Sequence, residues 1–109
     1  MNSYTVDRRR WGTMNILEQM GNIGSEVGRS IAAKRSGDEE RFRGALIRAL
    51  DLFDATIEVL IAQKSSRVRE VFIARDQYLN LFFGNAPKDD DKKIENYFMQ
   101  YAVAARIKR

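Results

Sequence analysis

Apolar residues recur at intervals of three and four positions along most of the chain, which is the period of an amphipathic α-helix. The first such stretch runs from about residue 8 to residue 35 and stops at Ser36 and Gly37. Glycine is common just past a helix C-terminus because it adopts the left-handed conformation without strain. The apolar positions of this stretch are Trp11, Met14, Leu17, Met20, Gly24, Val27 and Ile31. We expect one long helix here, with a separate short helix within residues 1–12 as the alternative.

The second stretch has the most regular pattern. Asp38 is suited to cap a helix N-terminus, and Glu39 and Glu40 follow in the first turn, where the helix dipole favours negative charge. This helix is expected to end near Lys64. Its apolar stripe consists of Phe42, Leu46, Ala49, Phe53, Ile57 and Leu60.

Two further helices are expected in the C-terminal half. One begins at a cap formed by Ser65 or Ser66 and closes at residues 84–87, which include the only proline, Pro87. The other runs from about Lys92 to the C-terminus, after the acidic run 89–91. Their apolar positions are Val68, Val71, Phe72, Leu79, Phe82 and Phe83, and then Ile94, Tyr97, Phe98, Tyr101, Ala102 and Ala105.

This pattern predicts an all-α fold. No stretch alternates apolar and polar residues in the way that a half-buried strand requires. The connections between the expected helices are short, and short connections favour antiparallel neighbours. We therefore predict one domain over residues 1–109, built as an up-down-up-down four-helix bundle.

The composition restricts the chemistry of the chain. Its 109 residues include neither histidine nor cysteine, the residues that carry much of general acid–base, nucleophilic and transition-metal chemistry. The carboxylates Asp51, Asp54 and Glu58 lack a Glu-x-x-His partner, and with Arg48 they are interpreted as part of a solvated, salt-bridged face. We expect no metal, no cofactor and no catalytic activity.

The charge and hydropathy of the chain bear on its partners. The net charge of +4 is compatible with RNA as a partner, although fifteen acidic residues are interspersed among the basic ones. No apolar run approaches the roughly 20 residues of a membrane span, and residues 1–10 lack the core of a signal peptide. We expect a cytoplasmic protein without a membrane partner.

Three glycines interrupt the first helical pattern. Gly21, Gly24 and Gly28 fall on or beside its apolar face, although each glycine inside a helix costs about 1 kcal/mol relative to alanine. Such a cost is offset where a second backbone approaches closely. We expect close helix packing at these glycines, within the chain or across a dimer.

One charge falls inside an apolar stripe of the third helix. Arg75 lies almost at the centre of that stripe, where an unpaired charge would cost several kcal/mol. A carboxylate partner is expected, either Asp54 or Glu26, and Tyr101 on the fourth helix would need a partner for its hydroxyl. These four residues are the candidate binding site, as a structural network or as a site for an anion or an RNA phosphate.

The segment Arg75-Asp76-Gln77-Tyr78-Leu79-Asn80 resembles the HEPN-family motif, in which an arginine and a polar residue precede a histidine on a helix. This resemblance implies a small all-α domain, often dimeric, that acts as a ribonuclease or as a partner in toxin–antitoxin and defence systems. Arg75 and Asp76 match the first part of the motif. Asn80 stands in place of the histidine, which argues against nuclease activity. Other segments resemble an uncharacterised prokaryotic helical-bundle family.

Two functions follow as hypotheses. The first is a non-catalytic protein-interaction module that forms a homodimer and assembles with a partner protein. The apolar content of the chain and its glycine-bearing helix favour such assembly. The second is an HEPN-like RNA-binding protein or ribonuclease that uses Arg75, Asp76 and Asn80. Binding of a small anion near Arg75 is a third reading.

Overall fold

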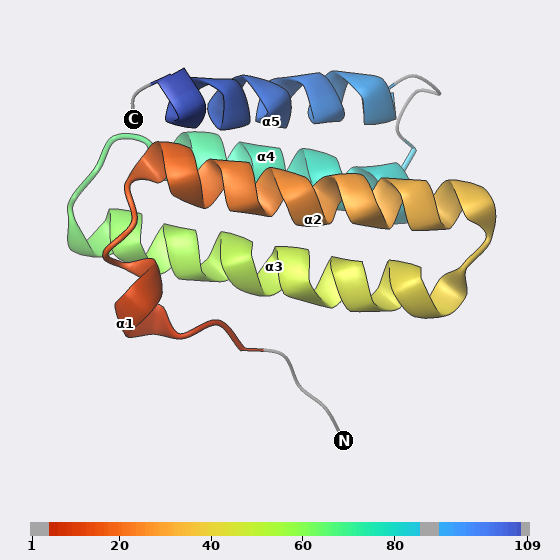
Figure 1. Cartoon of the computed structure of the whole chain (residues 1–109), viewed down its shortest axis with the longest axis horizontal. Helices are drawn as coiled ribbons and strands as arrows, with labels where there is room; N and C mark the ends of the chain where they lie inside the picture. Colours follow the sequence, from red (N-terminus) through yellow and green to blue (C-terminus); the bar gives the residue numbers. More distant parts are fainter. Residues whose placement is uncertain (1–4, 86–89, 108–109) are drawn as a thin grey trace.

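The computed structural model describes residues 5–85 and 90–107, and within these ranges it contains helices and no strands. The predicted all-α fold is confirmed (Figure 1). Some residues used in the sequence analysis lie outside the described ranges, namely Pro87, Asp89, Lys108 and Arg109. The helices are α1 (Arg8–Trp11), α2 (Ile16–Ser36), α3 (Glu39–Ala62), α4 (Val68–Phe83) and α5 (Asp90–Ile107).

The first expected helix is divided into α1 and α2. Asn15 begins α2 with a capping box, in which its side chain accepts a hydrogen bond from the Glu18 backbone and the Glu18 side chain accepts one from the Asn15 backbone. The short helix α1 is fixed by Trp11, whose indole Nε1 donates to Thr56 Oγ1 at 2.9 Å. The prediction of one continuous helix was therefore wrong, and the alternative of a short N-terminal helix is confirmed.

The other described helix boundaries follow mostly from local sequence. Gly37 ends α2 with a φ of 77°, and Asp38 caps α3 by accepting from the Arg41 backbone. The cap expected from Ser65 or Ser66 is absent, because α4 begins one residue beyond Arg67 without a side-chain cap. Ser65 instead accepts a hydrogen bond from the backbone N–H of Arg67, which stabilises the turn before the helix.

The four long helices pack side by side. Helix α2 contacts α3 and α5, α4 contacts the same two helices, and α1 lies against α3. In Figure 1 the colours, which follow the sequence, run in opposite directions along each long helix and the next. Successive long helices are thus antiparallel, as expected for elements joined by short connections. Every helix in the described ranges is either too short or too polar to span a lipid bilayer.

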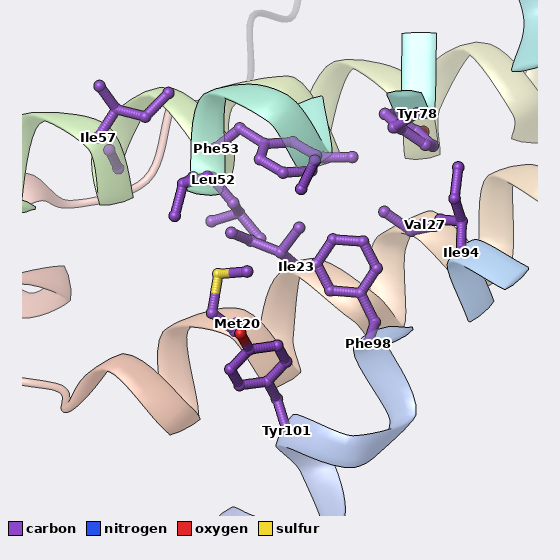
Figure 2. Close-up of a cluster of buried hydrophobic side chains, with 14 of the residues drawn as sticks. Met20, Ile23, Val27, Leu52, Phe53, Ile57, Tyr78, Ile94, Phe98 and Tyr101 are labelled. Atoms are coloured by element: carbon purple, nitrogen blue, oxygen red, sulfur yellow. The ribbon is translucent and has the colours of Figure 1, made fainter. Parts of the chain in front are cut away.

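The core lies between the long helices. Phe98 of α5 forms an edge-to-face pair with Phe53 of α3, with ring centroids 5.9 Å apart. Figure 2 shows the Phe98 ring directed into the cluster beside Ile23. Aromatic and aliphatic side chains from all four long helices thus meet in one cluster.

Two of the three glycines bring α2 close to α5. A Cβ at Gly24 would lie 2.7 Å from Cβ of Phe98, and a Cβ at Gly21 would lie 3.6 Å from Cα of Ala102. The close packing expected at these two glycines is therefore present, and it is made within the chain. Gly28 was wrongly assigned to it, because a Cβ there would meet nothing within 4 Å.

Candidate functional site

Arg75 lies at the edge of the core and not at its centre. The buried face of α4 consists of Val71, Ala74 and Tyr78, whereas Phe72 is 47% exposed. The face of α4 is thus rotated from the predicted stripe. On this face Tyr78 is hydrogen-bonded to Ser30 of α2, since their hydroxyls lie 2.7 Å apart in the buried core. The Arg75 side chain consequently remains 28% exposed.

Arg75 pairs with Asp54, one of the two expected carboxylates. Arg75 Nε lies 3.3 Å from Asp54 Oδ1, but it makes no hydrogen bond with good geometry. The Asp54 side chain is 51% exposed, so solvent screens the pair. This interaction places Nε of the Arg75 guanidinium beside a carboxylate of α3.

Glu26 belongs to a different cluster. Its side chain is 12% exposed, and Oε2 lies 3.0 Å from Arg48 Nε and 3.3 Å from Arg29 Nη1. The expected alternative pairing with Arg75 is therefore not made. Arg48 of α3, whose side chain is 36% exposed, is salt-bridged as expected, and its partner is this carboxylate of α2.

Asp51 does not lie on a solvated face. Its carboxylate accepts a hydrogen bond from the backbone N–H of Val6 and pairs with Arg8 at 3.0 Å. The segment that precedes α1 folds over this part of α3 and covers it. Helical geometry alone could not reveal this covering, because the segment contacts α3 through residues more than forty positions away.

Tyr101 takes part in a third polar cluster, between α4 and α5. Its hydroxyl donates to Glu70 Oε1 at 2.5 Å, and the Tyr97 hydroxyl donates to the same oxygen at 2.8 Å. These two hydrogen bonds, the one from Tyr101 first, lower the pKa of Glu70. Burial raises the pKa of both tyrosines. The hydroxyl of Tyr101 thus has its partner, and that partner is not Arg75.

The remaining motif residues lie on the surface of α4. Asp76 and Asn80 are exposed and line a shallow hollow of about 390 Å³ with Gln77, Leu79 and Phe83. Arg75 does not line this hollow. The structure therefore distributes Arg75, Tyr101 and Glu26 among three separate clusters, and it leaves Asp76 and Asn80 outside all of them.

Gln77 and Tyr97 mark a groove between α4 and α5. Both residues line a hollow of about 320 Å³ toward the start of α5 and one of about 360 Å³ toward the start of α4. The second hollow also includes Ile73, which is 47% exposed. The groove combines amide, hydroxyl and apolar groups with four charged side chains, those of Arg69, Glu70, Asp90 and Lys93.

Sequence reasoning missed an exposed apolar surface on α4 and α5. On α5, Met99, Val103 and Ile107 are 58%, 39% and 76% exposed and recur every four residues. On α4, Phe72, Ile73 and Phe83 are exposed as well. The signal was visible as a second set of apolar positions beside the core stripe, but periodicity does not tell which set is buried.

No group of three carboxylates suited to holding a metal ion occurs in the described ranges. No family model, curated protein or solved structure matches the chain.

Proposed function

We propose that this chain is a non-catalytic protein-interaction module, an up-down-up-down four-helix bundle that forms a homodimer and assembles with a partner protein. The observation that carries the proposal is the distribution of exposed large apolar side chains. Eight such residues occur in the described ranges, and six of them belong to α4 or α5. Exposed apolar side chains grouped on one helix face mark interaction sites, whereas single exposed apolar residues do not.

The spacing on α5 supports an interaction surface over chance exposure. Residues four positions apart lie above one another on a helix, so Met99, Val103 and Ile107 form one stripe. Leaving such a stripe in water forfeits about 25 cal/mol for each Å² that a partner would bury. Burial against a second protein recovers this free energy.

RNA binding at Arg75 has weaker support. Phosphate recognition by arginine relies on a free, bidentate guanidinium, and the guanidinium of Arg75 is held beside Asp54. Asp76, its neighbour in the motif, adds a negative charge on the exposed side of α4. Both carboxylates oppose the approach of a phosphate backbone.

Self-association is tested by sedimentation velocity of the full chain at protein concentrations from about 1 to 200 μM, a range that covers the micromolar affinities of weak interfaces. We expect a concentration-dependent dimer. The double variant Phe72→Glu with Met99→Glu should remain monomeric, because it places charges on both apolar surfaces. Ile47→Glu is the matched control, since Ile47 is 45% exposed on α3 and its variant should still dimerise. A wild-type chain that is monomeric throughout would contradict the proposal.

The RNA alternative has its own measurement. Single-stranded and hairpin RNAs are incubated with the chain, and cleavage and binding are followed by gel electrophoresis. We expect neither activity. Cleavage or binding that disappears in a folded Arg75→Ala variant would replace the interaction module with the RNA-directed function.

A further inference from the structure

The outward surface of α4 carries two opposite charges without partners. We define the α4 outward face as Arg69, Phe72, Ile73, Asp76, Asn80 and Phe83, which are all exposed and lie opposite the buried face of this helix. Among the residues that the structure describes, neither Arg69 nor Asp76 has an ion-pair partner. An exposed cation and an exposed anion thus share one face with exposed apolar side chains.

The two charges are placed symmetrically about the apolar residues. Arg69 and Asp76 are seven positions apart, which is two helical turns or about 10.5 Å. Phe72 and Ile73 lie midway between them. If a second α4 helix runs antiparallel across this midpoint, Arg69 of each copy lies opposite Asp76 of the other, and Phe72 of each copy lies opposite Ile73 of the other.

We infer that the α4 outward face is a homodimer interface, in which two antiparallel α4 helices are related by a two-fold axis between Phe72 and Ile73. The inference rests on the proposed function, since it assigns a location and a register to the self-association. Two reciprocal Arg69–Asp76 ion pairs flank an apolar centre. Such a surface is self-complementary, as a two-fold interface between identical chains requires.

The charges select this register among the alternatives. A parallel pair of α4 helices would place Arg69 against Arg69 and Asp76 against Asp76, and like charges in an interface are unfavourable. An antiparallel pair centred on Asp76 would also oppose two carboxylates. Charged residues among apolar contacts between helices are known to specify register and orientation, at some cost in stability.

The apolar stripe of α5 lacks this complementarity. Lys92 precedes the stripe on the same side of the helix, and Arg106 flanks its C-terminal end. An antiparallel pair of α5 helices centred on Met99 would place Lys92 of each copy opposite Arg106 of the other. The nearest anions, Asp91 and Glu95, already pair with Arg35 of α2. The stripe on α5 therefore fits a different protein better than a second copy.

The reciprocal ion pairs are tested with Arg69→Asp and Asp76→Arg. Each single variant opposes like charges at both ends of the interface, so its dimer dissociation constant should rise at least tenfold. An equimolar mixture of the two single variants should form heterodimers, because both pairs then become attractive. The variant with both changes should also recover the homodimer. Sedimentation velocity measures all four samples, with circular dichroism to confirm that each is folded.

Control variants separate this inference from the proposed function. Met99→Glu leaves the α4 outward face unchanged and should dimerise like the wild type. Single charge variants that dimerise as well as the wild type, or a mixture that shows no recovery, would overturn the α4 interface. If Met99→Glu abolishes the dimer while the α4 variants retain it, the interface is on α5 and the proposed function stands. A monomeric wild type would overturn both.

Discussion

The hydroxyl of Tyr78 on α4 lies 2.7 Å from the hydroxyl of Ser30 on α2, and both residues are completely buried. Ser30 Oγ also donates to the backbone carbonyl of Val27 at 2.7 Å. Because the serine has only one proton, the tyrosine is the donor between the two side chains. This hydrogen bond links two helices through the core and lies on the buried face of α4.

Removing the hydroxyl of Tyr78 or that of Ser30 should lower the free energy of unfolding, but the two losses should differ. Tyr78→Phe leaves Ser30 bonded to Val27, so we expect a loss of about 1 kcal/mol. Ser30→Ala leaves the Tyr78 hydroxyl buried without an acceptor, which costs about 1–3 kcal/mol. Urea unfolding of both variants and of the double variant measures this difference. Strictly additive effects would show that the two hydroxyls do not interact.

The same tyrosine should make the fold sensitive to alkaline pH. Burial raises the pKa of Tyr78 to about 12, whereas an unfolded tyrosine has a pKa of about 10. Above pH 10 the unfolded chain therefore releases this proton first, and the free energy of unfolding falls as the pH rises toward 12.

The contribution of Tyr78 to this loss is about 2–3 kcal/mol, since each pKa unit corresponds to about 1.36 kcal/mol. Urea unfolding at pH values from 9 to 12 measures it. The free energy of unfolding of Tyr78→Phe should decline less steeply with pH. The decline that remains in this variant includes the contributions of Tyr97 and Tyr101, whose pKa values burial also raises. An identical decline in the variant and the wild type would contradict the assignment to Tyr78.

The glycines of α2 provide a matched pair of substitutions. Gly24→Ala should destabilise the protein by about 1–3 kcal/mol, as overpacking does, because the new Cβ would lie 2.7 Å from Cβ of Phe98. Gly28→Ala should instead stabilise it by up to about 1 kcal/mol through helix propensity, since the space there is open. Thermal unfolding compares the two, and a stabilising Gly24→Ala would contradict the close packing of α2 on α5.

The contrast between α3 and α4 shows how far the sequence predicts the fold. The start of α3 was predicted because Gly37 and Asp38 act locally, through a left-handed φ and a side-chain cap. The buried face of α4 was not predicted, because apolar residues such as Phe72 and Tyr78 occur on several sides of this helix. Its orientation depends on a partner 48 residues away, and no local pattern encodes that distance.

The candidate site was predicted only in part, for the same reason. A carboxylate partner for Arg75 was expected, either Asp54 or Glu26, since a charge near a core requires an opposite charge within reach of its side chain, and the partner is Asp54. The partner of Tyr101 was missed, because Glu70 lies on α4 and becomes a neighbour only when α4 and α5 pack together. Both pairings join two helices: the sequence indicates that Arg75 requires a carboxylate, whereas the partner that a side chain meets depends on the relative rotation of the helices.

Glu70 should make a pH-dependent contribution to stability at the acidic end. Hydrogen bonds from Tyr101 and Tyr97 hold its pKa below the ordinary value of 4.5. A lowered pKa in the folded state stabilises the fold above the unfolded pKa, and this stabilisation is lost as the pH falls through the folded pKa. We expect Glu70→Gln to reduce the free energy of unfolding at pH 7 by about 1 kcal/mol, since solvent screens an exposed carboxylate.

The difference between the wild type and Glu70→Gln should therefore begin to shrink below about pH 4.5, where the carboxyl of the unfolded chain becomes protonated, and reach its minimum below the lower folded-state pKa. Urea unfolding at pH values between 3 and 7 tests this convergence. Glu58→Gln is the control, because it changes an exposed carboxylate whose partner, Arg8, is also partly exposed. Glu18→Gln is unsuitable, because the Glu18 side chain caps α2. A constant difference at all pH values would show that protonation of Glu70 does not change the stability, and so would contradict a lowered pKa in the folded state.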